Sequence, residues 1–345
     1  MHLFPLPTSI TNEPETYLLF LLISGVIIVN GWTDAPTAIA TCISSRTLTP
    51  KKAIILAAVM NFFGVFIMSR LSGKVASSIT NIATFDCDRK TVTLALCASL
   101  LSIIIWAVTA WFFGIPTSES HALVASVSGA ATALTKSISC INMSEWMKVI
   151  LGLFTSTILG FLLGFFIVKV VRVIIRNSDR IRTDRKFIHL QNLSAAFMAF
   201  MHGAQDGQKF IGIFIIFTSV SGEKTDTEIP VFLIVYTSLL MAFGTSVGGM
   251  RIIKAMGSDM VKLKKYQGFS ADLAGATSLL ISTVSGLPVS TTHTKTTAIM
   301  GVGAAKRLSS VDWKIAKEML MTWIFTFPVC GLLSYILTAI LMSLR

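Results

Sequence analysis

Long apolar stretches, separated by short polar segments, recur along the whole chain. A helix of about 20 apolar residues is long enough to cross the apolar core of a bilayer. Several stretches reach or approach that length, and polar residues interrupt some of them. They lie at Leu18–Val29, Ala53–Met68, Val92–Phe113, Val149–Val171, Phe187–Phe217, Val231–Val247 and Leu320–Leu341. No soluble fold needs so many apolar stretches, so the pattern predicts an all-α polytopic membrane protein.

An internal repeat divides this pattern into two halves. Residues 115–121 (IPTSESH) resemble residues 287–293 (LPVSTTH), and residues 30–34 (NGWTD) resemble residues 202–206 (HGAQD). Both pairs are offset by 172 positions (287 minus 115, and 202 minus 30). Two separate motifs with one offset indicate a duplicated chain. We therefore predict a first repeat over 1–172, a basic linker over 173–186 and a second repeat over 187–345.

Five membrane crossings fit into each half. In the first half we expect them at about 17–45 (broken), 52–70, 91–113, 116–135 and 147–170. In the second half we expect them at about 188–217 (broken), 230–247, 267–285, 288–305 and 318–342. Because five is odd, the two halves must insert upside down relative to each other. Inverted repeats of this kind are typical of secondary transporters, whose binding site lies near mid-membrane at the repeat interface.

The charge pattern orients the predicted topology. Only 13% of the 345 residues are charged, about half of the usual share in soluble domains, so most of the surface must face lipid. The net charge of +12 comes from short basic loops, which the positive-inside rule assigns to the cytoplasm, and not from a nucleic-acid site. These loops are 46–52, 172–186, 251–265 and 306–317, whereas the loop 223–228 is acidic. We therefore predict a multi-pass protein of the cell membrane with both termini outside.

Two polar interruptions within apolar sequence, 30–36 and 202–209, are expected to break their helices. Unwound backbone at membrane depth survives only where it lines a cavity, and acids inside the bilayer usually serve a function. Carboxylates beside freed carbonyl, amide and hydroxyl oxygens suit Na⁺, with a proton relay as the alternative. The residues predicted to couple a cation are Asn30, Thr33, Asp34, Gln205 and Asp206, with Asp34 and Asp206 as the Na⁺ ligands. A structural cluster that merely caps two half-helices is the competing interpretation.

The second repeated element marks two helix starts. Proline followed by serine or threonine is typical of a helix N-terminus, where free N–H groups and the helix dipole attract anions. Two such N-termini from opposite halves could face one oxyanion, although ordinary N-capping would need the same residues. The predicted substrate-binding residues are Ser118, Glu119, Ser120, Ser290, Thr291 and Thr292.

Several further polar residues lie close to these motifs or within apolar stretches. His121 and His293 follow the helix starts by one turn and either bind the ligand or are structural. Lys209 and Lys295 either counter an anion or extend their ammonium groups towards the membrane surface. The predicted supporting residues are Asn61, His121, His202, Lys209, Asp272 and His293. Five scattered cysteines without a CxxC pair indicate neither a zinc site nor a disulfide framework.

At these residues the chain resembles the inorganic phosphate transporter (PiT) family in its compact prokaryotic form. The resemblance runs from about Ser24 to Leu337. It is carried by residues 30–34, 202–209 (HGAQDGQK), 248–254 (GGMRIIK), 267–274 (QGFSADLA) and 286–293 (GLPVSTTH). It implies a phosphate symporter driven by Na⁺ or H⁺, built from inverted repeats, although one bacterial branch carries sulfate. It also implies ion binding at Asp34 and Asp206, anion contacts at Ser118, Ser290, Thr291 and Thr292, and sensitive positions at Asn61 and Asp272.

The chain departs from the family pattern in ways that bear on its substrate. Thr33 and Gln205 stand where the family has asparagine, and Pro36 adds a break. Glu119 stands where threonine or glycine is common. An ionised Glu119 would accept a hydrogen bond from phosphate and repel sulfate, which favours phosphate over a sulfate–proton symporter.

Other classes of function fit the sequence less well. A channel would need a continuous pore, whereas paired breaks at mid-membrane favour alternating access. A membrane hydrolase would need an activated nucleophile, and no Gly-x-Ser-x-Gly or HExxH signature accompanies Ser118 or Ser290. We therefore expect no enzymatic activity and no cofactor besides the coupling ion. A homodimer stays open.

Overall fold

The computed structural model describes residues 14–85, 87–115, 117–220, 229–247, 250–254 and 261–344. The regular secondary structure in these ranges is helical, and they contain no β-strand. The acidic loop 223–228, Pro116 and the glycine pair at 248–249 lie outside the described residues. The helices are α2 (Pro14–Thr33), α3 (Pro36–Ser44), α4 (Pro50–Leu71), α5 (Lys74–Thr80), α6 (Arg89–Phe113), α7 (Glu119–Thr135), α8 (Met143–Ile174), α9 (Arg180–Val220), α10 (Val231–Val247), α11 (Met250–Lys254), α12 (Lys265–Val284), α13 (Thr291–Ala304) and α14 (Trp313–Ser343), with 3-10 turns η1 (Ile138–Cys140) and η3 (Leu308–Ser310).

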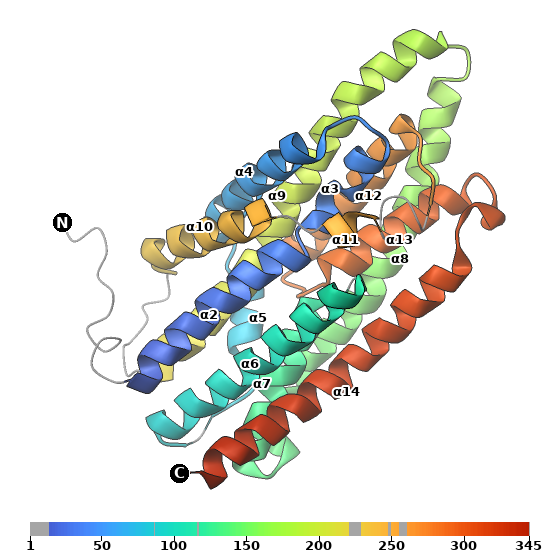
Figure 1. The fold of residues 1–345 in the computed structure, drawn as a ribbon. Coiled ribbons are helices and arrows are strands. Elements are labelled where there is room, and N and C mark those ends of the chain that lie inside the picture. Colours follow the sequence, from blue (N-terminus) through green and yellow to red (C-terminus); the bar gives the residue numbers. More distant parts are fainter. Residues whose placement is uncertain are drawn as a thin grey trace.

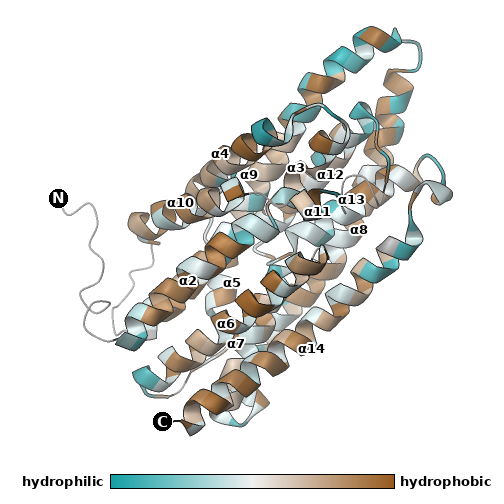
Figure 2. Ribbon diagram, in the orientation of Figure 1, coloured by the Kyte–Doolittle hydropathy of each residue, from teal (hydrophilic) through white to brown (hydrophobic). Residues whose placement is uncertain are grey.

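The helices form one elongated bundle whose ends are distinct (Figure 1). The start of α2 and the end of α14 lie at one end, and the turn between α8 and α9 lies at the other (Figure 1). Figure 2 shows that apolar residues cover the long helices, while hydrophilic residues gather at the α8–α9 turn. Large side chains such as Phe154, Ile158 and Phe166 on α8 and Ile324 and Leu332 on α14 are exposed. This apolar exterior suits lipid.

Five helical segments of the described chain are long and apolar enough to cross a membrane on their own. They are Pro14–Ser44, Pro50–Leu71, Arg89–Phe113, Met143–Ile174 and Ala316–Ser343. The prediction of an all-α polytopic membrane protein is thereby confirmed. The predicted crossings at 116–135 and 288–305 correspond to α7 and α13, of 17 and 14 residues. At 1.5 Å per residue these helices measure about 26 and 21 Å, less than the apolar core of about 30 Å.

The first predicted helix break is confirmed, and the second is wrong. The chain leaves α2 at Thr33 and enters α3 at Pro36. Pro36 has no N–H, so the carbonyl of Trp32 loses its helical donor. In the second half, α9 runs without interruption from Arg180 to Val220. The position that corresponds to Pro36 is Gln208, which keeps its N–H, so the helix continues.

Helix extends into the basic segment between the halves. α8 continues to Ile174 and α9 begins at Arg180, so helix covers much of the range 173–186. The side chains of Arg180, Arg182 and Arg185 are exposed. A helix extending into water needs no apolar face at this point, and its charged side chains remain hydrated.

The two helix starts are built alike. Gly114, after α6, and Gly286, after α12, have φ angles of 70° and 73°, in the region that glycine adopts without strain. The Ser118 and Ser290 side chains then cap α7 and α13 by accepting hydrogen bonds from the N–H groups of His121 and His293, each at 3.2 Å.

The two halves of the chain interlock at these helices. α7 packs along α14, and α13 packs along α8, so each short helix is covered by the long last helix of the other half. Glycines allow the close approach. A Cβ atom at Gly301 would lie 2.0 Å from the carbonyl oxygen of Phe161, and one at Gly129 would lie 2.2 Å from that of Gly331.

Candidate functional site

The repeated motifs meet at one buried centre. The break between α2 and α3 carries Asp34, and the middle of α9 carries Asp206. The first turns of α7 and α13 bring Glu119 and Thr291 to the same place. All four side chains are at most 3% exposed. The centre thus gathers both predicted cation-coupling acids and both predicted helix starts.

Asp206 is fully engaged by donors from three elements. Its Oδ1 atom lies 2.6 Å from the ammonium nitrogen of Lys209. Its Oδ2 atom lies 3.3 Å from Nε2 of His202 and accepts hydrogen bonds from Asn30 at 3.4 Å and from Thr291 at 3.2 Å. One of the two expectations for Lys209, that its ammonium group extends to a membrane surface, is therefore wrong. Lys209 neutralises a carboxylate inside the protein.

Asp34 has no such partner. Its carboxylate accepts hydrogen bonds from the hydroxyl groups of Thr292 and Thr291, the latter at 3.4 Å. Among the described residues it forms no ion pair. The ligand atoms of Asp34, His202 and Asp206 nevertheless lie within 4.8 Å of one another. The two acids related by the repeat therefore share one site but differ in charge compensation.

Glu119 adds a third carboxylate beside Asp34. Its Oε1 atom accepts a hydrogen bond from Thr33, and its Oε2 atom is buried without a hydrogen-bond partner in the described chain. A cavity of about 10 Å³, room for roughly one water molecule or an ion of similar size, lies against both acids. Its polar lining consists of Thr33, Asp34, Thr37, Thr117 and Glu119.

Thr37 and Thr117 are residues that the sequence analysis missed. The hydroxyl of Thr37 is buried and makes no hydrogen bond to the residues that the structure describes. Both threonines lie inside or next to the repeated motifs, and this position was the available signal. The polar side of this cavity carries hydroxyl and carboxylate groups, whose oxygens are of the kind that bind hard cations, and Ala107, Trp111, Ile115 and Ile252 form its apolar side.

The N-termini of α7 and α13 lie side by side at this centre. The rings of His121 and His293, one turn into each helix, are 4.6 Å apart between centroids. His121 also stacks on Phe327 at 4.4 Å, and His293 stacks on Trp323 at 3.7 Å. Neither imidazole contacts the carboxylates, and their ring nitrogens have no hydrogen-bond partner among the described residues. These two histidines therefore hold the helix starts together by aromatic contact.

Other predicted residues lie one layer away from the carboxylates. The amide of Gln205 donates to the carbonyl of Leu287 at 2.8 Å and accepts from Thr283 at 2.9 Å, so Gln205 joins α9 to the α12–α13 connection. Asn61 contacts Nδ1 of His202 at 3.3 Å and donates to Thr245 at 2.9 Å. Asn61 thus orients His202, which in turn contacts Asp206.

Asp272 belongs to a separate buried cluster. It forms an ion pair with Lys295 and accepts hydrogen bonds from Thr41 at 2.5 Å and Ser194 at 3.5 Å. These four residues come from α12, α13, α3 and α9, and both charged side chains are 0% exposed. The structure therefore separates Asp272 and Lys295 from the carboxylate centre.

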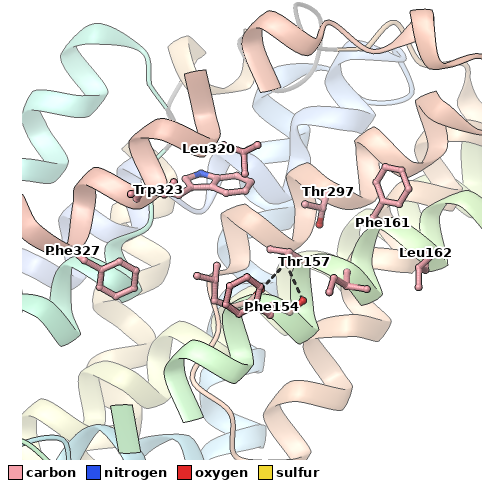
Figure 3. Close-up of a pocket in the computed structure, with 11 residues that line it drawn as sticks. Phe154, Thr157, Phe161, Leu162, Thr297, Leu320, Trp323 and Phe327 are labelled. Atoms are coloured by element: carbon pink, nitrogen blue, oxygen red, sulfur yellow. Dashed lines mark hydrogen bonds between the residues drawn. The ribbon is translucent and has the colours of Figure 1, made fainter. Parts of the chain in front are cut away.

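A larger cavity of about 580 Å³ lies on the apolar exterior and not at this centre. Phe154 and Phe161 of α8 and Trp323 and Phe327 of α14 line it (Figure 3). The hydroxyl of Thr157, which also lines it, donates to carbonyls of its own helix at 2.7 and 3.0 Å. A groove with this lining suits a lipid chain better than a hydrated anion.

The charge of the buried centre decides what it can bind. Asp34, Glu119 and Asp206 face one ammonium group, that of Lys209, so an anion alone would meet a net negative charge. The adjacent helix starts offer the opposite, since their N–H groups and hydroxyl groups can bind an oxyanion. The arrangement can therefore hold an anion when cations or protons compensate the carboxylates.

Comparison with known proteins identifies the family. The profile of the phosphate transporter family matches residues 30–334. A Bacillus subtilis (strain 168) protein, known as "Probable low-affinity inorganic phosphate transporter", is 36% identical over 322 residues, which cover 93% of this chain and 95% of that protein. A Rhizobium meliloti (strain 1021) protein of the same name is 35% identical, covering 93% of this chain and 96% of that protein.

A solved structure shares the fold. The structure described as "The sodium-dependent phosphate transporter" matches with a TM-score of 0.86 at 19% identity, covering 95% of this chain and 99% of that one. These names describe transport proteins and not enzymes. Because the family profile and the bacterial relatives cover nearly the whole chain, the resemblance found in the motifs is confirmed, and the protein belongs to the phosphate transporter family.

Proposed function

We propose that the protein is a symporter that carries inorganic phosphate across the cell membrane together with a cation, by alternating access. The observation that carries the proposal is the meeting of two capped helix starts and two repeat-related acids at one buried centre. The names of the bacterial relatives, which describe low-affinity inorganic phosphate transporters, support phosphate as the substrate.

The helix starts of α7 and α13 account for anion binding. Ser118 and Ser290 accept hydrogen bonds from backbone N–H groups, which leaves their own hydroxyl hydrogens available to a ligand. Free N–H groups in the first turn of each helix add further donors. Two helix N-termini with touching histidine rings would approach a tetrahedral oxyanion from two sides.

Glu119 favours phosphate over sulfate. At neutral pH phosphate still carries protons and can donate a hydrogen bond, whereas sulfate cannot. The free Oε2 atom of Glu119 lies at the start of α7 and is an acceptor for such a donor. A sulfate–proton symporter is the alternative within the family.

The carboxylates account for coupling to a cation. Three buried acids against one lysine would repel an anion, so binding of the cation and of phosphate should be mutually dependent. Hydroxyl and carboxylate oxygens around the cavity suit Na⁺. The sodium-dependent transporter of the same fold supports this choice over H⁺.

Inverted repeats supply the alternating access. α2 and α9, which the offset of 172 residues relates, begin at opposite ends of the bundle (Figure 1). The first repeat occupies 1–172 and the second 187–345, joined by the basic cytoplasmic segment at 173–186. With the α8–α9 turn inside, both termini lie outside the cell.

Phosphate binding to the purified protein tests this proposal. Reciprocal coupling requires that the cation lowers the Kd for phosphate by the same factor by which phosphate lowers the Kd for the cation. We expect phosphate to bind in the presence of Na⁺, to bind far more weakly in choline at constant pH, and to outcompete sulfate. Equal affinity with and without Na⁺, together with an affinity that does not change with pH, would refute cation coupling at this centre.

A further inference from the structure

The ammonium group of Lys209 lies in a setting that resembles a cation site. Its three donors meet three oxygen atoms, which are Oδ1 of Asp206 at 2.6 Å, the carbonyl of Val289 at 2.6 Å and the hydroxyl of Ser120 at 2.5 Å. Lys209 is 2% exposed. A carboxylate, a carbonyl and a hydroxyl are also the oxygen ligands that a hard cation takes. We call this set of three oxygens the Lys209 cage.

The repeat supplies a second cage of the same composition. Moving each cage residue by 172 positions again gives one carboxylate, one backbone carbonyl and one hydroxyl. The pairs are Asp206 with Asp34, Val289 with Thr117, and Ser120 with Thr292. Two of these residues, Asp34 and Thr117, line the small cavity, and the Thr292 hydroxyl donates to Asp34. We call this second set the Asp34 cage.

The two cages differ in what stands at the position of the lysine. The position that corresponds to Lys209 is Thr37, whose side chain is uncharged and therefore brings no positive charge into the Asp34 cage. Thr37 lines the cavity and is 1% exposed, and its hydroxyl has no hydrogen-bond partner in the described residues. Glu119, whose repeat counterpart Thr291 is uncharged, adds a second acid to this cavity. The Asp34 cage therefore holds more uncompensated negative charge than the Lys209 cage, so a mobile cation would be more stable there.

We infer that the Lys209 ammonium is a tethered cation that permanently fills one of two repeat-related cation cages, so that only the Asp34 cage takes up a mobile coupling cation. The inference rests on the proposed symport and specifies its stoichiometry. Because its three donors are already used, the lysine has none left for phosphate. A transporter with both cages open would move one more cation with each phosphate than this chain does.

Exchanging the two cage residues tests the inference. Lys209→Thr installs the residue of the Asp34 cage and should open the second cage. Thr37→Lys should fill the first. Lys209→Arg keeps the charge and is the matched control. The charge moved per phosphate, measured from the reversal potential of uptake in proteoliposomes, counts cations whatever their identity.

We expect Lys209→Thr to move one more positive charge per phosphate than wild type and to bind Na⁺ with a Hill coefficient above one. Lys209→Arg should keep the wild-type charge per phosphate. An unchanged charge in Lys209→Thr overturns the inference. So does a folded Lys209→Thr protein that binds no phosphate at any cation concentration, because the lysine would then be needed for the anion.

A further measurement keeps this inference separate from the proposed function. Binding of radioactive ²²Na⁺ to purified protein needs no phosphate. We expect one Na⁺ per wild-type chain, two per Lys209→Thr chain and none per Thr37→Lys chain. If Lys209→Thr does not fold, Thr37→Lys tests the inference instead. Na⁺ binding by Thr37→Lys equal to that of wild type would overturn the inference that a lysine can fill a cation cage. Absence of phosphate transport in wild type with these Na⁺ numbers intact would instead refute the proposed function.

Discussion

The buried ion pair between Asp272 and Lys295 gives a sharp prediction about stability. Both side chains are 0% exposed, and Thr41 and Ser194 complete the cluster. Removing one partner leaves the other as an uncompensated buried charge, which costs about 3–5 kcal/mol. We expect Lys295→Leu and Asp272→Leu each to lower the free energy of unfolding by that amount.

The double substitution should be far milder than either single one. The offset of 172 residues pairs Asp272 with Leu100 and Lys295 with Leu123, both buried in the apolar core. The corresponding positions in the other half are therefore occupied by two buried leucines. Replacing a buried ion pair with apolar side chains of similar volume is often neutral or stabilising. The remaining cost is the loss of a partner for the Thr41 hydroxyl, about 1–3 kcal/mol.

A double-mutant cycle measures this coupling. The free energy of unfolding is determined in mixed micelles for wild type, both single variants and the double variant. We expect the double variant to be more stable than either single variant, with a coupling energy of at least about 3 kcal/mol, the top of the range for residues in contact. Additive losses would show that the two charges do not depend on each other and would refute the reasoning.

Two further predictions concern packing and anion binding. Gly301→Leu should sharply lower thermal stability because its Cβ would lie 2.0 Å from the Phe161 carbonyl oxygen. The control Gly331→Ala should be tolerated, since the nearest atom to its Cβ would be 3.5 Å away. Equal stability of the two variants would contradict the close α8–α13 contact. Ser118→Ala and Ser290→Ala should each weaken phosphate binding by about 1.5–3 kcal/mol, which isothermal titration measures. Each should also lower the stability of the protein by about 0.5–2 kcal/mol through loss of the helix cap, which thermal unfolding measures separately. Reduced stability with an unchanged Kd would leave these serines as helix caps only.

The sequence predicted the outline of the fold because two kinds of local signal agree. Apolar length marks the long helices, and the Gly-x-Pro-x-Ser motif marks the two helix starts, whose glycines have matching φ angles. The prediction of a second helix break from repeat symmetry failed, because one residue differs between the two repeats. Pro36 breaks the first helix, but its counterpart Gln208 can donate an N–H, so α9 continues.

The charge pairing could be predicted only in part. Lys209 follows Asp206 by three positions, so a helix places them on the same face. The sequence does not reveal how deep this face lies, and a lysine near the membrane surface would have extended into water. The pair of Asp272 and Lys295 joins two different helices, and its formation depends on how α12 and α13 pack.

Concentrative uptake in proteoliposomes tests the central claim most directly. Labelled phosphate is measured against an imposed inward Na⁺ gradient for wild type and for Asp34→Asn, which removes the charge of the Asp34 cage and keeps its shape. Symport through this centre predicts phosphate accumulation above equilibrium in wild type, its loss when the gradient is collapsed, and no accumulation by folded Asp34→Asn. Accumulation by Asp34→Asn equal to that of wild type would contradict coupling at this centre.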